Sequence, residues 1–127
     1  MPAQTPEQCD ELFGKYFNAQ DLDRLVALYE PQASLVNEDG IVAQGTRAIR
    51  ETMQGVFAAF PQAKITINVV RVVHAGDDLA VLYNEWSASG KAANGSPFTM
   101  EHKAMEIVRR QSDGTWRFAV DDDYARG

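Results

Sequence analysis

Apolar residues recur at helical spacing in the first half of the chain and alternate as in strands in the second half. Three helices are expected over residues 5–17, 21–29 and 46–60. Their expected N-caps are Thr5, Asp21 and Thr46, and Pro31 and Pro61 are expected to end the second and third helices.

Most of the remaining chain predicts strands. Two short strands are expected at residues 33–36 and 41–43, and four long strands at 65–74, 79–90, 97–111 and 116–123. Asp113-Gly114 indicates a tight hairpin before the last strand. Helices followed by antiparallel strands indicate the α+β class, and no linker interrupts residues 1–127, so we expect a single domain.

The composition restricts the classes of binding partner and the cellular compartment that we expect. The chain has a formal net charge of -6 and scattered basic residues, which argues against nucleic-acid binding. No apolar run approaches the roughly 20 residues that cross a bilayer, so no membrane partner is expected. Cys9 is the single cysteine and no signal peptide is visible at the N-terminus, so we expect a cytoplasmic protein without intramolecular disulfides.

The long strands carry apolar residues on both faces. Leu82 and Trp86 lie on one face of their strand, and Val81 and Tyr83 lie on the other. Helices cover only one face of such a sheet, so we expect a homodimer through the second face. The alternative is a monomer with scattered apolar surface residues.

Residues 21–36, 45–50 and 105–118 together resemble the nuclear transport factor 2-like superfamily, in the right order along most of the chain. Within it, the sequence is most similar to the SnoaL-like and SgcJ/EcaC-like groups and to the ketosteroid isomerases. The resemblance implies a cystatin-like cone, with three N-terminal helices packed on a curved, mixed, mostly antiparallel sheet around a pocket. Members include isomerases, cyclases, hydratases and binding domains, so a fold of this kind does not define one activity.

The resemblance to ketosteroid isomerases also implies positions for catalytic groups. The position of the family's catalytic base falls on Asn37, which cannot abstract a proton, and that of its oxyanion-hole tyrosine falls on Phe13, which has no hydroxyl. The family's protonated acid falls on Glu106. Nearby substitutes are Glu38 or Asp39 for the base and Tyr16 for the hydroxyl.

Strand alternation places Glu106 and His102 on the same face of their strand. If Asp113-Gly114 is a two-residue turn, the hairpin register sets Glu106 opposite Asp121. Two adjacent carboxylates do not both ionise easily, so one pKa should rise, as a general acid in a pocket requires. Alternatively, this face points to solvent or to a dimer partner.

The same strands supply further candidates. His102 is either a proton shuttle, paired across the strands with Glu85, or a structural hydrogen-bonding residue in the pocket wall. Asp123 is expected to point inward beside Asp121, with Asp122 outward. No spacing fits a calcium loop or a zinc set, and no nucleotide-binding motif is present, so neither a metal nor a cofactor is expected.

We therefore expect a pocket for a small apolar ligand. The leading hypothesis is cofactor-free acid/base isomerisation, cyclisation or hydration of an apolar cyclic or carbonyl compound. Glu106 and Asp121 would be the acids, His102 or Tyr16 an auxiliary donor, and Asn37 an orienting group. Substrate contacts are expected from Phe13, Tyr16, Phe57, Phe60, Tyr83, Glu85 and Asp123. The rival hypothesis is a non-catalytic ligand-binding or dimerising module.

Overall fold

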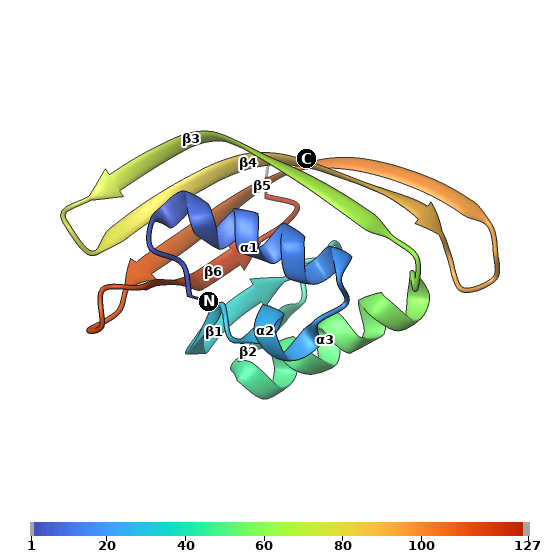
Figure 1. The fold of residues 1–127 in the computed structure, drawn as a ribbon, viewed down its shortest axis with the longest axis horizontal. Coiled ribbons are helices and arrows are strands. Elements are labelled where there is room, and N and C mark those ends of the chain that lie inside the picture. Colours follow the sequence, from blue (N-terminus) through green and yellow to red (C-terminus); the bar gives the residue numbers. More distant parts are fainter. Residues whose placement is uncertain (1, 126–127) are drawn as a thin grey trace.

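The computed structural model describes residues 2–125, in which an arched sheet curves over three helices (Figure 1). The helices are α1 (Pro6–Asn18), α2 (Leu22–Val26) and α3 (Thr46–Ala59). The strands are β1 (Tyr29–Val36), β2 (Val42–Gln44), β3 (Lys64–Ala75), β4 (Leu79–Lys91), β5 (Pro97–Arg110) and β6 (Trp116–Asp122). This arrangement confirms the expected α+β class.

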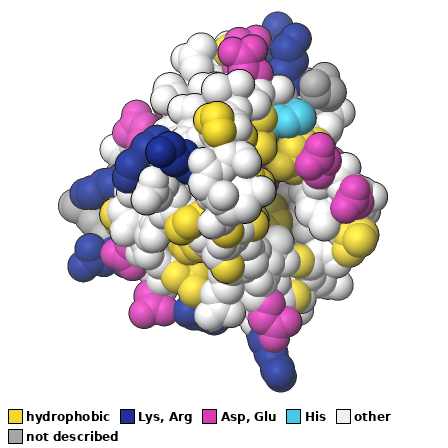
Figure 2. All heavy atoms as spheres, turned by 90° about the vertical axis from the view of Figure 1, so that its right-hand side faces the viewer, with side chains coloured by type: hydrophobic (Ala, Val, Ile, Leu, Met, Phe, Trp, Pro, Cys, Tyr) yellow, Lys and Arg dark blue, Asp and Glu magenta, His cyan; other side chains and the backbone are white. Residues whose placement is uncertain are grey.

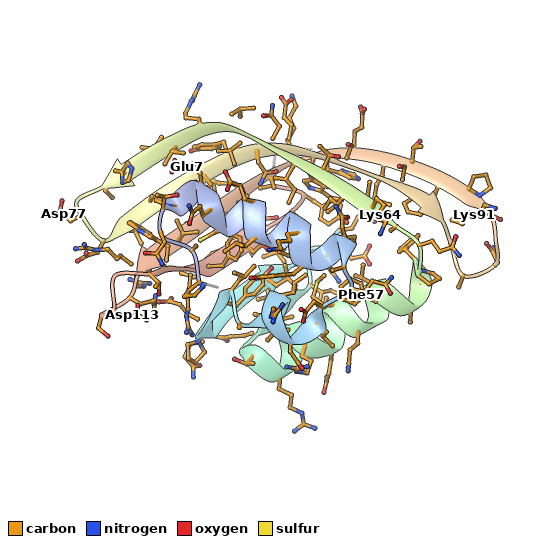
Figure 3. The ribbon with its side chains drawn as sticks, viewed as in Figure 1. Glu7, Phe57, Lys64, Asp77, Lys91 and Asp113 are labelled. Atoms are coloured by element: carbon orange, nitrogen blue, oxygen red, sulfur yellow. The ribbon has the colours of Figure 1, made fainter. Side chains whose placement is uncertain are left out.

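One six-stranded sheet contains all of these strands in the order β2-β1-β6-β5-β4-β3. Only the β1–β6 pair is parallel among the described strands, so the sheet is mixed and mostly antiparallel. Helix α1 lies under the concave side of the long strands, and α3 packs beside β1 and β2 (Figure 1). Asp77 and Lys91 mark the tips of the two long hairpins, at opposite ends of the arch (Figure 3).

Two of the three helices begin at the expected caps. The Thr5 hydroxyl accepts a hydrogen bond from the Gln8 N–H at 3.3 Å, and the Asp21 carboxylate accepts one from the Arg24 N–H at 3.2 Å. The expected cap of α3 is wrong, because Thr46 is its first helical residue. Gly45 takes the cap position with φ of 89°, a conformation that glycine adopts at little cost.

The second helix is shorter than its apolar spacing predicts. It ends at Val26, and Tyr29 begins β1 instead of closing the helix. Parallel pairing with β6 competes with the local helical preference, and the Phe118 N–H donates to the Leu28 carbonyl at 2.8 Å. Pro31 therefore lies inside a strand, in the irregular stretch of the β1–β6 ladder where its missing N–H is tolerated.

The hydrophobic core fills the end of the arch near the β3–β4 and β5–β6 turns. Leu82 and Val108, on the concave face of β4 and β5, are fully buried together with Phe118 of β6. Cys9 of α1 is buried against the same cluster. Among the described helices, none has the length and apolar character to cross a bilayer.

The convex face carries a row of aliphatic side chains. Strand pairing aligns Val73, Val81, Ile107 and Val120 side by side across β3 to β6. Val73 is 45% exposed, and the other three are partly exposed. No helix among residues 2–125 covers this row, so the long strands are indeed apolar on both faces.

Candidate functional site

A cavity of about 160 Å³ lies between the helices and the concave face, toward the open end of the arch. Figure 2 looks at that end, where hydrophobic side chains lie in a hollow of the surface. Its apolar lining consists of Phe13, Phe17, Met53, Val56, Phe60, Ala63, Ile65, Ile67, Trp86, Ala88, Phe98, Met100 and Tyr124. Its polar lining consists of Glu38, Asn84, Glu106, Asp121 and Asp123. The cavity is thus apolar with one acidic wall.

The acidic wall depends on the register of β5 and β6. Glu106 pairs with Asp121, as expected, but the turn is longer than the expected two-residue loop, because the Gln111 N–H donates to the Thr115 carbonyl. The register set by that turn would pair Glu106 with Val120. A bulge at Ala119 inserts one residue and shifts the pairing by one. Because side chains alternate, the bulge also turns Asp121 to the concave face.

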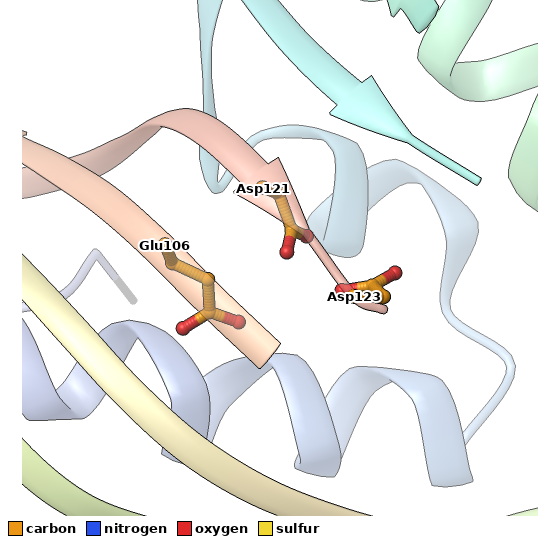
Figure 4. Close-up of side chains that lie close together, drawn as sticks. All are labelled: Glu106, Asp121 and Asp123. Carbon is orange, nitrogen blue, oxygen red and sulfur yellow. The ribbon is translucent and has the colours of Figure 1, made fainter. Parts of the chain in front are cut away.

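Glu106, Asp121 and Asp123 form a compact group in which one carboxylate oxygen of each lies within 4.8 Å of the others. Figure 4 shows the three side chains converging from β5 and from the end of β6. Glu106 is 4% exposed and Asp121 is 1% exposed, whereas Asp123 is partly exposed. The inward positions expected for Asp121 and Asp123 are therefore found.

A fourth carboxyl lies behind this group. Asp10 of α1 is 2% exposed and contacts Glu106. The Asn84 amide, from the concave face of β4, donates to Asp10 at 3.2 Å and to Glu106 at 3.0 Å. This amide therefore links the helix to the acidic wall of the cavity.

Asp121 has its own buried donor. The Tyr29 hydroxyl, from the start of β1, donates to Oδ2 of Asp121 at 2.5 Å. Burial, and then the charge of Asp121, raise the pKa of Tyr29 well above its usual value. The tyrosine therefore stays neutral and keeps its proton available for this hydrogen bond.

Desolvation is the main influence on all four carboxyls. Burial and then the negative charges of Asp10 and Asp121 raise the pKa of Glu106 well above its usual value, and burial and then Asp121 do the same to the pKa of Asp123. Burial also raises the pKa of Asp10, to about 6, although hydrogen bonding with Glu106 opposes the rise.

Burial likewise raises the pKa of Asp121, but hydrogen bonds from Asp123, Tyr29 and Glu106 favour its ionised form. Protons at neutral pH therefore reside mainly on Glu106 and Asp123. Asp10 and Asp121 are the ionised acceptors of these protons. The wall thus combines neutral acids with ionised carboxylates at close range.

Three rings stand beside Asp123 near the mouth of the cavity. The His102 ring lies 5.1 Å from Trp86 and 4.6 Å from Tyr124, centroid to centroid. The Trp86 indole N–H donates to the Asp123 carbonyl at 2.9 Å, which ties the end of the chain to β4. Burial, and then Asp123 and Glu38, raise the pKa of Tyr124 to about 12.

The strand register separates His102 from its expected partner. His102 pairs with Trp86, and Glu85 pairs with Lys103 on the convex face. The expected His102–Glu85 pairing is therefore wrong, because neighbouring residues of a strand point to opposite faces. Glu85 is exposed there, so it is not part of the cavity lining.

The aromatic candidates divide between cavity, core and outer surface. Phe13 and Phe60 line the cavity as expected. Tyr16 is buried in the core, and Phe57 packs against Phe17 with ring centroids 5.3 Å apart, so neither borders the cavity. Tyr83 lies on the convex face, where Arg71 stands 5.8 Å from its ring centroid.

Asn37 organises a turn instead of facing the cavity. Its side-chain oxygen accepts hydrogen bonds from the N–H groups of Asp39 at 3.0 Å and Ile41 at 2.9 Å. The next residue, Glu38, does line the cavity, whereas Asp39 does not. Of the two substitutes considered for the family's base, the structure therefore places only Glu38 at the site.

Sequence reasoning missed Asp10, Asn84, Tyr29 and Tyr124. Asp10 occupies an apolar position of the first helix, three residues before Phe13, and Asn84 lies between two core positions of its strand. A lone polar residue at a buried position was the available signal for both. Tyr29 gave no such signal, because its strand pairs with a segment far along the chain.

Only one described group of side chains has the spacing to hold a metal ion, namely Glu106, Asp121 and Asp123. Calcium and magnesium require at least six oxygen ligands, often completed by water. The lining opposite these three acids is largely aromatic and aliphatic, so it adds few oxygen atoms. The donor set fits proton sharing better than a hard cation.

Residues 11–119 match the family model of the SnoaL-like domain, which places the chain in this family. The chain is thus a pocket protein of the nuclear transport factor 2-like superfamily, as its sequence resemblance implied. No curated protein matches it.

Three solved structures show the breadth of the fold. A ketosteroid isomerase-like protein from Erwinia carotovora atroseptica SCRI1043 is 18% identical, with a TM-score of 0.80 over 95% of this chain and 93% of that one. A hexachlorocyclohexane dehydrochlorinase is 12% identical, with a TM-score of 0.83 over 91% and 79%. A protein of unknown function with a cystatin-like fold from Nostoc punctiforme is also 12% identical, with a TM-score of 0.78 over 93% and 86%. The expected cystatin-like fold is confirmed, and identities this low carry no activity across.

Proposed function

We propose that this protein is an enzyme that catalyses isomerisation, cyclisation or hydration of a small apolar cyclic or carbonyl compound by acid/base chemistry without a cofactor. The observation that carries the proposal is the pairing of Glu106 with Asp121 in the buried wall of an apolar cavity. Catalytic carboxyls are typically placed so that burial and neighbouring charge separate their protonation states. A cavity of about 160 Å³ suits a single-ring compound better than a larger one.

Each acidic side chain has a role that follows from its surroundings. Glu106 holds a proton at neutral pH, so it serves as the general acid toward a carbonyl or hydroxyl oxygen. Asp121 is held ionised by Tyr29 and serves as the base toward a proton on the neighbouring carbon. Asp123 shares its proton with Asp121 and supplies it for the return transfer.

The remaining candidates act around this pair. His102 packs edge-to-face against Tyr124 and positions that ring at the cavity, and its role as a proton shuttle stays a prediction. Asn37 acts through its turn, which presents Glu38 to the cavity. Glu38 is the proposed second base, since it is the acid nearest to the family's expected base position.

The proposal can be tested by a thermal-shift screen of single-ring ketones, enols and hydroxy compounds, followed by turnover assays of the hits. Glu106→Gln keeps the shape of the side chain and removes its ionisable group, so turnover should fall by about 10²–10⁴-fold. Glu101→Gln is the matched control, since Glu101 lies on the same strand but is exposed on the convex face. Equal turnover in wild type and Glu106→Gln would contradict the proposed acid.

The alternative function is a non-catalytic ligand-binding or dimerising module. Asn37 and Phe13 favour it, because neither can perform the chemistry of the isomerase position that it matches. A ligand that binds tightly, reaches the cavity and is recovered unchanged after long incubation with the wild-type protein would support this alternative.

We also propose that the protein forms a homodimer through the convex face of the sheet. The aliphatic row Val73–Val81–Ile107–Val120 lies beside a second row that begins with Arg71 on β3 and ends with Asp122 on β6. A two-fold axis through the middle of the sheet would bring Arg71 of one copy toward Asp122 of the other. The face is thus complementary to itself in charge as well as apolar.

A further inference from the structure

The cavity contains acids without any matching cation. Its lining includes Glu38, Glu106, Asp121 and Asp123, and Asp10 stands directly behind Glu106. None of the lining residues that the structure describes is Lys, Arg or His. In Figure 2 the Lys and Arg side chains lie toward the edges of the view and not around the hollow. A buried negative charge without a partner is unfavourable, so the site suits a ligand that brings a positive charge.

The hydrogen bonds around these carboxyls also show an imbalance, because buried acceptors outnumber buried donors. Oε1 of Glu106, Oδ1 of Asp121 and Oδ1 of Asp10 are buried and receive no N–H or hydroxyl donor from the described residues, so the protons that the carboxyls share are their only donors. The buried donors nearby, the Asn84 amide and the Tyr29 hydroxyl, already bind the other oxygens of these carboxyls. Buried acceptors without donors are unfavourable, and a ligand with several N–H donors would satisfy those that face the cavity.

The cavity walls around the acids are rich in aromatic side chains, which also favour a cationic ligand. Trp86, Tyr124, Phe13 and Phe17 present aromatic rings to the cavity, next to or opposite the carboxyls. Aromatic faces attract cations electrostatically, and aromatic side chains combined with carboxylates suit ammonium groups. They do not supply the oxygen ligands that a hard metal ion requires.

We propose that the natural ligand of this cavity is a small apolar amine, protonated at neutral pH, whose ammonium group lies among Glu106, Asp121 and Asp123. The inference rests on the proposed function in placing the substrate in this cavity, and it adds the charge and the donor group of that substrate. The proton transfer would then act on an atom next to the amine. The ammonium group supplies both the donors and the positive charge that the acidic wall lacks.

Three ligands of the same size test this inference at pH 7 by isothermal titration calorimetry: benzylamine, benzyl alcohol and benzoate. Benzylamine should bind at least about 10-fold more tightly than benzyl alcohol, and benzoate should not bind. Equal binding of benzylamine and benzyl alcohol, or tighter binding of benzoate, would overturn the proposal. So would stabilisation by magnesium, calcium or manganese chloride alone together with a lack of binding by benzylamine.

Two variants test which residues cause the preference for benzylamine over benzyl alcohol. Asp121→Asn removes an ionised carboxylate and should reduce the ratio of benzylamine to benzyl alcohol affinity to less than about 3-fold. Glu106→Gln replaces a carboxyl oxygen with an NH₂ group that repels the ammonium group, so it should lower the ratio as well. Asp77→Asn, at the far hairpin tip, removes the same charge without touching the cavity and should leave the ratio intact (Figure 3). A ratio that survives in both cavity variants would show that these acids do not recognise the amine.

The preference should also depend on pH. The titratable groups around the site are Asp10 from α1, Tyr29 from β1, Glu106 from β5 and Asp121 from β6, together with Glu38, His102, Asp123 and Tyr124 at the mouth. Asp10, whose pKa is raised to about 6, loses its proton between pH 5 and pH 8 while benzylamine keeps its own, so amine affinity should rise across that range. A flat profile would contradict the inference. Glu106-dependent turnover of neutral compounds with no amine preference would uphold the proposed function alone, whereas amine preference without turnover would contradict only the catalysis.

Discussion

The two faces of β5 and β6 differ in a way that reverses the usual distribution of polarity. On the concave face, Glu106 and Asp121 are buried side by side. On the convex face, the residues one position away, Ile107 and Val120, are partly exposed. Sheets that pack on one side normally bury the aliphatic residues and expose the charged ones.

Neither face has the arrangement that favours folding of an isolated chain. Buried carboxyls lose hydration, and exposed aliphatic side chains keep apolar surface in contact with water. In contrast, the sealed end of the same strands has an ordinary apolar pair, Val108 with Phe118, both fully buried. The reversal is therefore local, and it indicates that each face is completed by something outside the chain. We propose a ligand for the concave face and a second copy for the convex face.

The largest expected effect concerns the convex face. Ile107→Lys places a charge in the middle of the aliphatic row, and burying it should weaken the dimer by about 10²–10³-fold. Analytical ultracentrifugation over a concentration series would measure the shift toward monomer. Thr99→Lys, exposed on the same strand and outside the row, is the control and should not alter the equilibrium. Persistence of the wild-type dimer in Ile107→Lys would argue for another interface.

The concave face should make stability depend on pH. Asp10 has a pKa of about 6 in the folded state against 3.8 as its reference value, so the folded state binds the proton more tightly. The contribution of Asp10 protonation to the free energy of unfolding is therefore fully present below about pH 4. It is lost as pH rises through 6, which lowers the free energy of unfolding by about 3 kcal/mol. About half of this decline falls between pH 5 and pH 8, where urea unfolding of wild type and Asp10→Asn would measure it.

Asp10→Asn should lose part of the decline between pH 5 and pH 8. Asp77→Asn, which also removes one acid, should keep the wild-type slope. If both variants and the wild type share one slope, the buried cluster does not control the pH dependence.

A smaller effect is expected from the donor of Asp121. Tyr29→Phe removes the hydroxyl and leaves a buried carboxylate with one bond fewer, which should cost about 2 kcal/mol of folding stability. The pKa of Asp121 should rise as well, because the hydrogen bond favours its ionised form. The acidic limb of the turnover profile should therefore move to higher pH. If Tyr29→Phe loses stability but keeps the wild-type pH profile of turnover, Tyr29 contributes only to packing.

The smallest effect is expected at Asn37. Asn37→Ala removes two turn hydrogen bonds at a partly exposed site and should cost about 0.5–1 kcal/mol. Asn37→Asp retains a side-chain oxygen for both bonds and should restore stability, as measured by urea unfolding. Turnover should change by less than about 3-fold in Asn37→Ala. A loss comparable to that of Glu106→Gln would make Asn37 itself a catalytic group.

The elements of the fold follow from local patterns in the sequence. Apolar spacing and turn residues predicted the long strands β3, β4, β5 and β6 within a few residues, because periodicity is a property of each segment by itself. The capping residues Thr5 and Asp21 were predictable for the same reason. The end of the second helix was not, since pairing of Tyr29 with distant β6 overrides the local preference.

The sequence by itself determined that the last two strands carry acids next to aliphatic residues. Tertiary structure decided where those acids point. The predicted Glu106–Asp121 pair is found, although the predicted turn is wrong, because the longer turn and the bulge at Ala119 shift the register by one residue in opposite directions. Asp10 and Tyr29 reach the same carboxyls from segments distant in sequence. Such convergence depends on the packing of α1 against the sheet and on the pairing of β1 with β6, and no local pattern encodes it.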